Sequence, residues 1–374
     1  MKKILRYPIL IMFAVFIAAF SLADWISPPR EFSELENRYL KQRPTPSVRN
    51  IFNGEYSSAY EEYINDQFIL RDEWITLKSY SESALLKTEN NGIVYGKDGR
   101  LFDKYTDYPA DQLEKNLGFL QEFMQGRGNV TMMIVPSSYE IYPEQLPAGL
   151  TLVDQQEKIA EIYAGLPDNV TTIDLYPTLM AAKEGDIYYR TDHHWTTDGA
   201  YLGYQAFCEA KNQTPVSLES LTAHDVSGFL GTFFSKCKKA GTPSEVLRWY
   251  ELPIAEVTVD GQQKDSYLDL SALETRDKYG AFLWGNGGIT VLTSESGAQK
   301  PTEDRSRILV IKDSFANCFS PFLTANYDEV WIVDLRSMPK GLTELVEQNS
   351  FTDILFLYNF TNLASDTNLF RLRY

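Results

Sequence analysis

Short apolar runs alternate with helix-like segments in the part of the chain that follows residue 110. Apolar residues recur at helical spacing across 110–125 and 154–165. The apolar runs are VTMMIV (130–135), VTTIDL (170–175), RILVIKDS (307–314), EVWIVDLR (329–336) and DILFLYN (353–359). Continuous Val/Ile/Leu runs of this length are typical of strands buried on both faces. The pattern predicts an α/β fold, a parallel sheet with helices on both faces.

The segment before these runs has a helical pattern of its own. Apolar residues are spaced as in a helix over 53–88, and we expect Phe68, Leu70 and Trp74 to form a buried stripe along it. We therefore place the start of the α/β domain at residue 53.

Two further segments complete the predicted domain, which covers residues 53–374. NNGIVYGKDGRLF (90–102) contains two strand-like runs joined at Lys-Asp-Gly, the signal of a hairpin. Between about 215 and 300 the pattern is irregular and includes the glycine-rich stretches FLGTF and FLWGNGGI. We interpret residues 215–300 as an insertion that packs beside the sheet.

The N-terminus has the pattern of a translocation signal. Lys2, Lys3 and Arg6 precede an apolar run from residue 8 to residue 23, and Asp24 ends the run. The run is near the upper length of a signal-peptide core and, with its flanks, approaches the length that spans a bilayer. Both interpretations remain open, and we favour the anchor.

These N-terminal residues predict the location of the rest of the chain. Residues 1–26 are a membrane anchor, or a signal peptide cleaved near Ala23, and the positive-inside rule places the chain after residue 30 outside the cytoplasm. Residues 27–52 are polar and contain several prolines, which predicts an extended stalk.

Composition narrows the choice of partners. The formal net charge is −16 and the pI is about 4.7, which argues against binding nucleic acid or an anionic membrane face. The three cysteines, Cys208, Cys237 and Cys318, have no metal-site or disulfide-framework spacing.

Three of the predicted strands end in polar residues, which packing of an apolar core does not require. Since the carboxyl ends of parallel strands meet at one edge of the sheet, these groups should converge on one cleft. A serine hydroxyl there needs a base, an acid that orients the base, and donors for the oxyanion. The strand-end residues are Asp313, Ser314, Asp334, Arg336, Tyr358 and Asn359.

The stretch YYRTDHHWTTDGA (188–200) can provide the base and the acid. An aspartate two residues before a histidine on a short turn lets the carboxylate of Asp192 orient the ring of His194, as in a Ser-His-Asp triad with Ser314 as nucleophile. His193 is the alternative base.

Structural roles for the same residues are also open. Asp192 can cap the helix expected near Thr196, and Ser314 can cap the helix that follows its strand. A metal site built on Asp192, His193 and His194 would need a further ligand from a distant part of the chain. Trp195 is either a packing residue or part of a sugar-binding surface, and Arg336 is either a donor to substrate or the partner of an acidic neighbour.

Several pieces of the chain together resemble one family. TDHHWT, IKDSFANCFSPF and the N-terminal pieces ENRYL, GEY, DQF and GKDGRLF are similar to the DHHW proteins, relatives of the alginate O-acetyltransferase-like branch of the SGNH hydrolases. The similarity runs from about residue 35 to the C-terminus. Lys312 stands where ordinary SGNH enzymes have glycine, and Asp192 to His194 is one residue shorter than their Asp-x-x-His; both features fit the circularly permuted branch better.

The resemblance implies a fold, an activity and a set of roles. The fold would be a permuted SGNH-like α/β domain, with Asp192, His194 and Ser314 as triad and Arg336, Tyr358 or Asn359 as oxyanion donors. The activity would be an extracytoplasmic O-acetyltransferase or O-acetylesterase that acts on a cell-envelope or secreted polysaccharide. No metal or organic cofactor would be required, and a membrane-embedded acyltransferase would supply acetyl groups. The alternative is a non-catalytic envelope binding or scaffold protein that keeps the fold.

Overall fold

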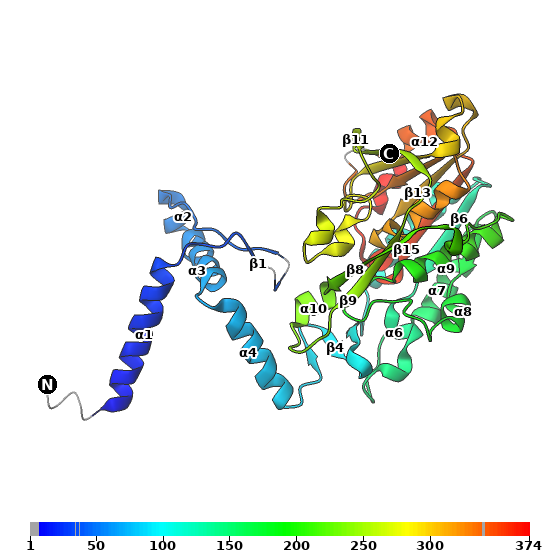
Figure 1. The fold of residues 1–374 in the computed structure, drawn as a ribbon. Coiled ribbons are helices and arrows are strands. Elements are labelled where there is room, and N and C mark those ends of the chain that lie inside the picture. The colour runs from blue at the N-terminus through cyan, green and yellow to red at the C-terminus, as the bar shows by residue number, and fades with distance from the viewer. Residues whose placement is uncertain (1–6, 34, 37, 339–340) are drawn as a thin grey trace. The chain divides into compact units, whose positions relative to one another are not determined.

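The computed structural model describes residues 7–33, 35–36, 38–338 and 341–374 (Figure 1). The chain forms two compact units. The first comprises Met1–Lys87 with Lys238–Gly241, and the second comprises Thr88–Cys237 with Thr242–Tyr374. Helices expected over 53–88 thus belong to the first unit.

The first unit is built from helices and one small antiparallel strand pair. The elements of this unit are α1 (Pro8–Ile26), β1 (Phe32–Ser33), β2 (Arg38–Tyr39), α2 (Val48–Phe52), α3 (Glu55–Gln67) and α4 (Arg71–Ala84). The longest of these helices, α1, carries no charged residue before Asp24 and is long and apolar enough to cross a membrane.

The helix expected over 53–88 is broken between α3 and α4. Phe68 is extended and Leu70 lies in the left-handed region with φ of 55°, so the backbone changes direction there. The buried stripe was a wrong prediction, because Phe68 and Trp74 are each 39% exposed and Leu70 is 53% exposed. Instead, the rings of Phe68 and Trp74 meet that of Phe20 in α1, at 6.3 and 5.9 Å between centroids.

The second unit is centred on an eight-stranded sheet in the order β11-β10-β12-β14-β13-β15-β6-β7. The five strands from β14 to β7 are parallel to one another. They correspond to the five apolar runs, so the predicted α/β class and its parallel sheet are confirmed. These strands are β6 (Val130–Val135), β7 (Thr171–Asp174), β13 (Arg307–Lys312), β14 (Glu329–Val333) and β15 (Asp353–Asn359).

The remaining three strands make the sheet mixed. They pair antiparallel and all come from 215–300, so part of the expected insertion extends the sheet instead of packing beside it. The three strands are β10 (Ile254–Val259), β11 (Gln262–Lys264) and β12 (Ile289–Ser294). β10 and β11, at this end of the sheet, have exposed positions and lack the continuous apolar run that marks a central strand.

The rest of the segment 215–300 packs as a separate strand pair with short helices. β8 (Ala223–Phe229) pairs antiparallel with β9 (Glu245–Tyr250), and α10 (Thr232–Cys237) lies between them in sequence. α11 (Glu295–Ala298) follows β12. The three cysteines are buried.

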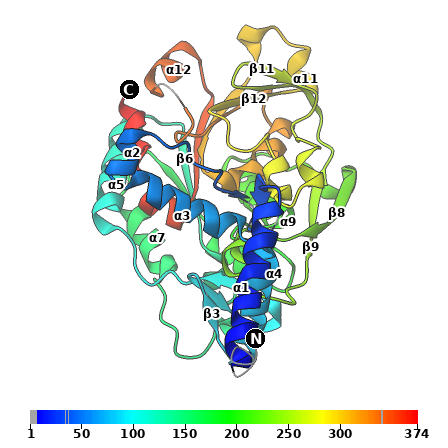
Figure 2. The ribbon, with the colours of Figure 1, turned by 90° about the vertical axis from the view of Figure 1, so that its left-hand side faces the viewer.

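Helices cover both faces of the sheet, and each face has its own apolar core (Figure 2). One core includes side chains of α6 (Ser138–Ile141), α8 (Tyr176–Ala181) and α9 (Thr197–Ala210). The other includes those of α5 (Ala110–Met124), α7 (Gln155–Ala164) and α13 (Phe360–Ser365), with α12 (Thr343–Gln348) beside it. The helices predicted near 110–125 and 154–165 are confirmed as α5 and α7.

The predicted hairpin is confirmed, with one strand added. β4 (Ile93–Tyr95) and β5 (Leu101–Asp103) pair antiparallel around a turn at Lys97–Gly99, and β3 (Glu89–Asn90) joins β4. Asp103 ends β5 and lines a cavity of the second unit.

Two carboxylates in the first unit are tied down by arginines. Asp66 is only 6% exposed and accepts two bonds from the Arg38 guanidinium, at 2.6 and 2.8 Å, and one from the Lys41 N–H. Glu36 forms ion pairs with Arg71 and Lys238. The Arg38 hydrogen bond lowers the pKa of Asp66 to about 2. At Glu36, burial raises the pKa of the carboxyl group, but the hydrogen bonds and charges of Arg71 and Lys238 outweigh burial and lower this pKa to about 2.

Acid is expected to loosen the contacts of Asp66 and Glu36 in the first unit. Both folded pKa values lie below the ordinary carboxyl value of about 4, so the stabilisation is present above about pH 4 and is lost as the pH falls through about 2. Hydrogen exchange of residues 38–41, corrected for the intrinsic rate, should show protection at about pH 5 that is lost near pH 2. In Asp66→Asn much of this pH dependence should disappear. Unchanged protection of the original chain at both pH values would contradict the assignment.

Candidate active site

Ser314 lies just beyond the carboxyl end of β13, one of the parallel strands. β13 stops at Lys312, and Asp313 caps the 3₁₀-helix Ser314–Asn317 by accepting the Phe315 N–H at 2.9 Å. The cap is therefore Asp313, and the Ser314 hydroxyl is available for another partner. Ser314 is 9% exposed, and its Oγ lies 2.7 Å from Nε2 of His194.

Asp192, His194 and Ser314 form a continuous series of side-chain hydrogen bonds. Nδ1 of His194 lies 2.6 Å from Oδ1 of Asp192, while Nε2 of the same ring faces Ser314 Oγ. An Nδ1–H that donates to the carboxylate leaves Nε2 free to accept from the serine hydroxyl. The structure thus brings together the three residues predicted as a triad, from segments 120 residues apart.

Local hydrogen bonds hold Asp192 in place. The residue is 1% exposed; Oδ1 also accepts the His194 N–H at 2.9 Å, and Oδ2 accepts the Thr232 N–H at 2.6 Å. Burial would raise the pKa of Asp192, but the neighbouring His193 and His194 and these hydrogen bonds hold it well below its ordinary value. Asp192 is therefore a carboxylate at neutral pH, able to stabilise a positive charge on His194.

Asp192 does not serve as a helix cap. Thr196 caps α9 by accepting the Gly199 N–H at 3.1 Å. Neither Asp192 nor Ser314 therefore caps the helix that follows it; Thr196 and Asp313 do so.

Gly231 gives the carboxylate of Asp192 room to approach the backbone. A Cβ on Gly231 would lie 2.2 Å from Cβ and 2.3 Å from Oδ2 of Asp192, so no larger residue fits without displacing the aspartate. The FLGTF stretch is glycine-rich, but nothing in the sequence links it to the Asp-His pair. Sequence reasoning therefore missed both Gly231 and Thr232 as site residues.

The ring of His194 lies between two other rings. The ring of Tyr279 stacks on that of His194, with 3.7 Å between the centroids and 10° between the planes. The ring of His193 is also 3.7 Å from that of His194 between centroids, and the two planes are tilted by 39°. The Tyr279 hydroxyl donates to the Ser314 carbonyl at 3.0 Å. Tyr279 therefore contacts both the ring of His194 and the backbone of Ser314. It comes from the irregular segment, where no local pattern marked it.

His193 has a partner other than the serine. Its Nδ1 lies 2.7 Å from Thr232 Oγ1 and 3.4 Å from Asp192 Oδ1, and its side chain is 34% exposed. Burial, followed by the adjacent His194, lowers the pKa of His193. The geometry connects Ser314 with His194 and leaves His193 at the side of the triad.

Asp192, His193 and His194 each offer a donor atom within 4.8 Å of the others. In this arrangement Oδ1 of Asp192 and Nδ1 of His194 bond each other. A metal ion that used these two atoms would therefore have to break the Asp–His contact.

Trp195 packs inside the domain. Its side chain is fully buried, and its Nε1–H donates to the Phe315 carbonyl at 2.8 Å. It stacks on Phe319 at 6.3 Å. The sugar-binding alternative for Trp195 was wrong, because a side chain without exposed surface cannot contact a glycan.

Arg336 is held by an acidic neighbour, which is the second of its two predicted roles. Its Nε and Nη2 donate to the two oxygens of Asp334 at 2.8 and 2.6 Å. The buried Lys312 also donates to Asp334, at 3.1 Å. Arg336 borders a second cavity, of about 230 Å³, together with Asp313 and Asn362, but it makes no hydrogen bond to Ser314.

Tyr358 and Asn359 are engaged elsewhere, against the expectation that they are oxyanion donors. Side chains alternate along β15, and Tyr358 packs in the core on the face opposite to that of Trp195 and Phe315. Asn359 donates through Nδ2 to the Val135 carbonyl at 2.9 Å, which ties the ends of β15 and β6.

Asp313 joins the strand end to its neighbours. Its Oδ2 accepts the Asn359 N–H at 2.8 Å and Nδ2 of Asn362 at 2.7 Å. Burial raises the pKa of Asp313, although these donors lower it. The position of Ser314 therefore depends on a neighbouring carboxyl group that sequence reasoning left without a role.

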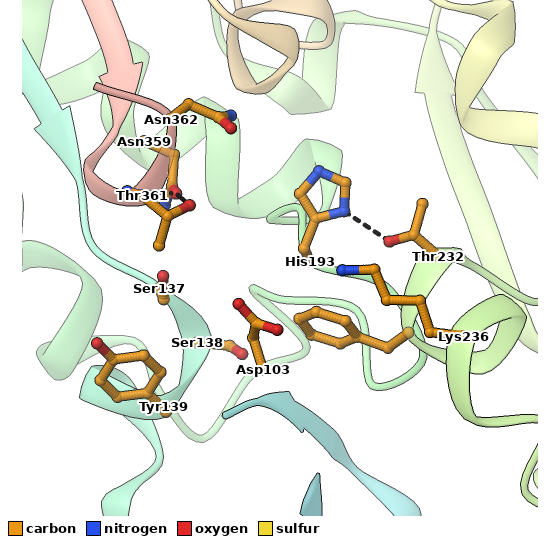
Figure 3. Close-up of a pocket in the computed structure, with 11 residues that line it drawn as sticks. Asp103, Ser137, Ser138, Tyr139, His193, Thr232, Lys236, Asn359, Thr361 and Asn362 are labelled. Carbon is orange, nitrogen blue, oxygen red and sulfur yellow. Dashed lines mark hydrogen bonds between the residues drawn. The ribbon is translucent and has the colours of Figure 1, made fainter. Parts of the chain in front are cut away.

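A cavity of about 240 Å³ opens beside His193 (Figure 3). Three of its residues donate hydrogen bonds to the carboxyl groups beside His194 and Ser314: Thr232 to Asp192, and Asn359 and Asn362 to Asp313. Its lining consists of Asp103, Ser137, Ser138, Tyr139, His193, Thr232, Phe233, Lys236, Asn359, Thr361 and Asn362.

The fold and site define an α/β protein with serine-hydrolase-like geometry at the carboxyl edge of its parallel strands. Residues 81–333 match the family described as DHHW protein, and the chain belongs to this family.

Curated relatives match part of the chain. The probable alginate O-acetylase AlgJ of Pseudomonas fluorescens is 27% identical over 190 residues, which are 47% of this chain and 48% of the relative. The protein of the same name from Pseudomonas aeruginosa is 29% identical over 162 residues, 40% of this chain and 41% of the relative. The chain thus spans about half the length of the curated relatives it matches.

Two solved structures share the fold. A DHHW family protein from Eubacterium siraeum has a TM-score of 0.63 and 23% identity, covering 76% of this chain and 96% of its own. Bacillus cereus PatB1 has a TM-score of 0.61 and 23% identity, covering 73% and 97%. At this identity, the likeness concerns the fold alone.

Gly231→Ala is expected to disturb the triad without unfolding the domain. The added methyl group must displace Asp192 and lengthen its bond to His194. In ¹H NMR, the downfield Nδ1 proton of His194 should broaden or vanish, with circular dichroism unchanged. Gly118→Ala is the matched control, because its Cβ would meet nothing within 4 Å. An unchanged His194 proton in Gly231→Ala would contradict this account of the glycine.

Proposed function

We propose that this protein is an extracytoplasmic serine acyl-ester enzyme that transfers or removes acetyl groups on a cell-envelope or secreted polysaccharide. The observation that carries the proposal is the hydrogen-bonded line from Asp192 through His194 to Ser314, at 2.6 and 2.7 Å. Family membership and the names of the alginate O-acetylases support acetyl as the acyl group and a polysaccharide as the substrate class.

In the first half-reaction Ser314 becomes acetylated. Its Oγ attacks the carbonyl carbon of the donor ester while Nε2 of His194 takes the hydroxyl proton. Asp192 stabilises the imidazolium without taking its proton. When the tetrahedral intermediate collapses, the bond to the donor's alkoxy oxygen breaks, and His194 returns the proton to that oxygen. The acetyl group remains on Ser314 and the donor leaves as an alcohol.

The second half-reaction reverses these steps with a different hydroxyl. A sugar hydroxyl, or water in an esterase, attacks the acetyl-serine as His194 accepts its proton. The bond from the acyl carbon to Ser314 Oγ then breaks, and the proton passes from His194 to the serine. Only the acceptor distinguishes a transferase from an esterase, so the chemistry of the triad is the same in both.

The backbone of Ser314 is the best supported oxyanion donor. Within the described part of the chain, its N–H donates to no carbonyl or side chain, and it begins a 3₁₀-helix next to the attacking oxygen. A free amide next to the nucleophile is the arrangement that stabilises a tetrahedral oxyanion. Arg336 and Tyr358 have no part in this proposal, because their contacts lie elsewhere.

The N-terminal helix supports an envelope location. α1 is long and apolar enough to span a bilayer, and Lys2, Lys3 and Arg6 precede it in the sequence. With the positive-inside rule, the domain that carries the site lies outside the cytoplasm, anchored by α1 or released near Ala23. Activated acetyl donors are made in the cytoplasm, so a membrane-embedded acyltransferase is the partner that we propose as acetyl source.

Ser314→Ala is expected to remove ester cleavage. Without Oγ no acyl-enzyme forms, and kcat/KM for a chromogenic acetyl ester should fall by about 10³-fold or more. Ser320→Ala is the matched control, because that serine is also buried and its hydroxyl has no partner within the described structure. Equal rates for the original chain and Ser314→Ala would end the assignment of Ser314 as nucleophile.

Asp192→Asn should leave the fold intact but misorient the base. An amide that replaces the carboxylate cannot stabilise the imidazolium, and its NH₂ group favours the wrong tautomer of His194. We expect kcat to fall by about 10³–10⁴-fold with KM changed much less. Steady-state kinetics on the same acetyl ester measure both constants. A fall of less than about tenfold would argue against Asp192 as the orienting acid.

A further inference from the structure

The cavity beside His193 contains two charged groups without partners. The carboxylate of Asp103, at the end of β5, forms neither a hydrogen bond nor an ion pair with any residue that the structure describes, and neither does the ammonium of Lys236. Figure 3 shows both side chains directed into the same space, below the ring of His193. A carboxylate that is partly desolvated and unpaired is costly, and a ligand that donates hydrogen bonds to it would offset that cost.

The electrostatics of the cavity agree with this description. Burial raises the pKa of Asp103, and the nearby charges of Lys236 and His193 offset it only in part. Ser138, which is buried, lines the same space and has no hydrogen-bond partner for its hydroxyl in the described structure. The cavity therefore offers an acceptor carboxylate, a cationic donor and a hydroxyl to one occupant.

The cavity adjoins the triad through three contacts. The ring of His193 lies 3.7 Å from that of His194. Thr232 lines the cavity and donates its N–H to Asp192, while Asn362 lines it and donates to Asp313, the residue before Ser314. An occupant of this cavity would thus be next to the catalytic groups without displacing them.

We infer that this cavity binds the acceptor, and that the acceptor is an uncharged, hydroxyl-rich sugar ring and not a uronate; the inference rests on the proposed function. Asp103 accepts hydrogen bonds from sugar hydroxyls, and Lys236 donates to a hydroxyl or ring oxygen. The volume of about 240 Å³ suits one monosaccharide unit and lies below the roughly 300 Å³ at which sites for drug-sized ligands begin.

Charge decides between the classes of sugar. One carboxylate and one ammonium give the cavity no net charge, so a uronate would bring a second carboxylate beside Asp103. The whole chain has a formal net charge of −16, which repels a polyanion at long range. Both effects favour a neutral glycan, although the curated relatives carry the name of alginate O-acetylases.

Binding can be measured in the absence of turnover with the full-length Ser314→Ala chain. The sequence has three histidines, His193, His194 and His224, so selective ¹³Cε1 labelling gives three ring signals, which single histidine substitutions assign. The probes are four neutral tetrasaccharides (β-glucan, β-mannan, β-galactan and N-acetylglucosamine), a tetramannuronate and a glucosamine tetramer. At least one neutral tetramer should shift His193 and leave His224 unmoved, with affinity at least tenfold above that of the other two classes.

Two variants locate the binding site. Asp103→Asn, in the same Ser314→Ala background, should weaken binding of the neutral tetramer at least fivefold. Asp265→Asn removes an exposed carboxylate outside the cavity and should bind as the parent does. Equal affinities in all three chains would overturn the role of Asp103.

Other outcomes separate this inference from the proposed function. If the charged tetramers bind as well as every neutral one, or if no tetramer shifts His193, the acceptor assignment is wrong, although Ser314-dependent ester cleavage still supports the enzyme. If a neutral tetramer binds at His193 but ester cleavage is independent of Ser314, the cavity assignment as a sugar site is supported and the catalytic proposal fails.

Discussion

The hydrogen-bonded carboxylate of Asp192 is the interaction on which the site depends. A buried carboxylate is stable only when its oxygens are satisfied, and here the acceptors are filled by the ring and N–H of His194 and by the N–H of Thr232. These donors come from two segments of the chain, so the requirement holds the segments together. Gly231 allows the approach because it has no Cβ.

A second buried carboxyl group has a different task. Asp313 accepts hydrogen bonds from the Phe315 N–H, the Asn359 N–H and Asn362, so it connects the end of β13 to the end of β15. Asp192 acts on the histidine, whereas Asp313 positions the serine backbone. The two aspartates near Ser314 thus have different contacts, because their hydrogen-bond partners differ although their residue type is the same.

The central elements were predictable because their signals are local. Continuous apolar runs identified five parallel strands, and helical spacing identified α5 and α7, since both periodicities are visible within a few turns or residues. The antiparallel strands β10 and β11 were not predicted, because their exposed positions interrupt the apolar pattern. The stripe of Phe68 and Trp74 was wrong for a related reason: apolar spacing shows that a face is hydrophobic but not what covers it.

The sequence by itself predicted the three residues of the proposed triad, because Asp192 and His194 are two residues apart and Ser314 ends a recognisable strand. The tertiary structure alone decided which histidine meets the serine. It paired Arg336 with Asp334 and Trp195 with the Phe315 carbonyl, and it packed Tyr358 in the core on the opposite face of the sheet. It also assembled Thr232, Tyr279 and the charged cavity around the site. The hydrogen bonds from Thr232 to Asp192 and between Ser314 and His194 join positions 40 and 120 residues apart in the sequence. Local periodicity cannot predict such contacts, because it reflects only neighbouring residues.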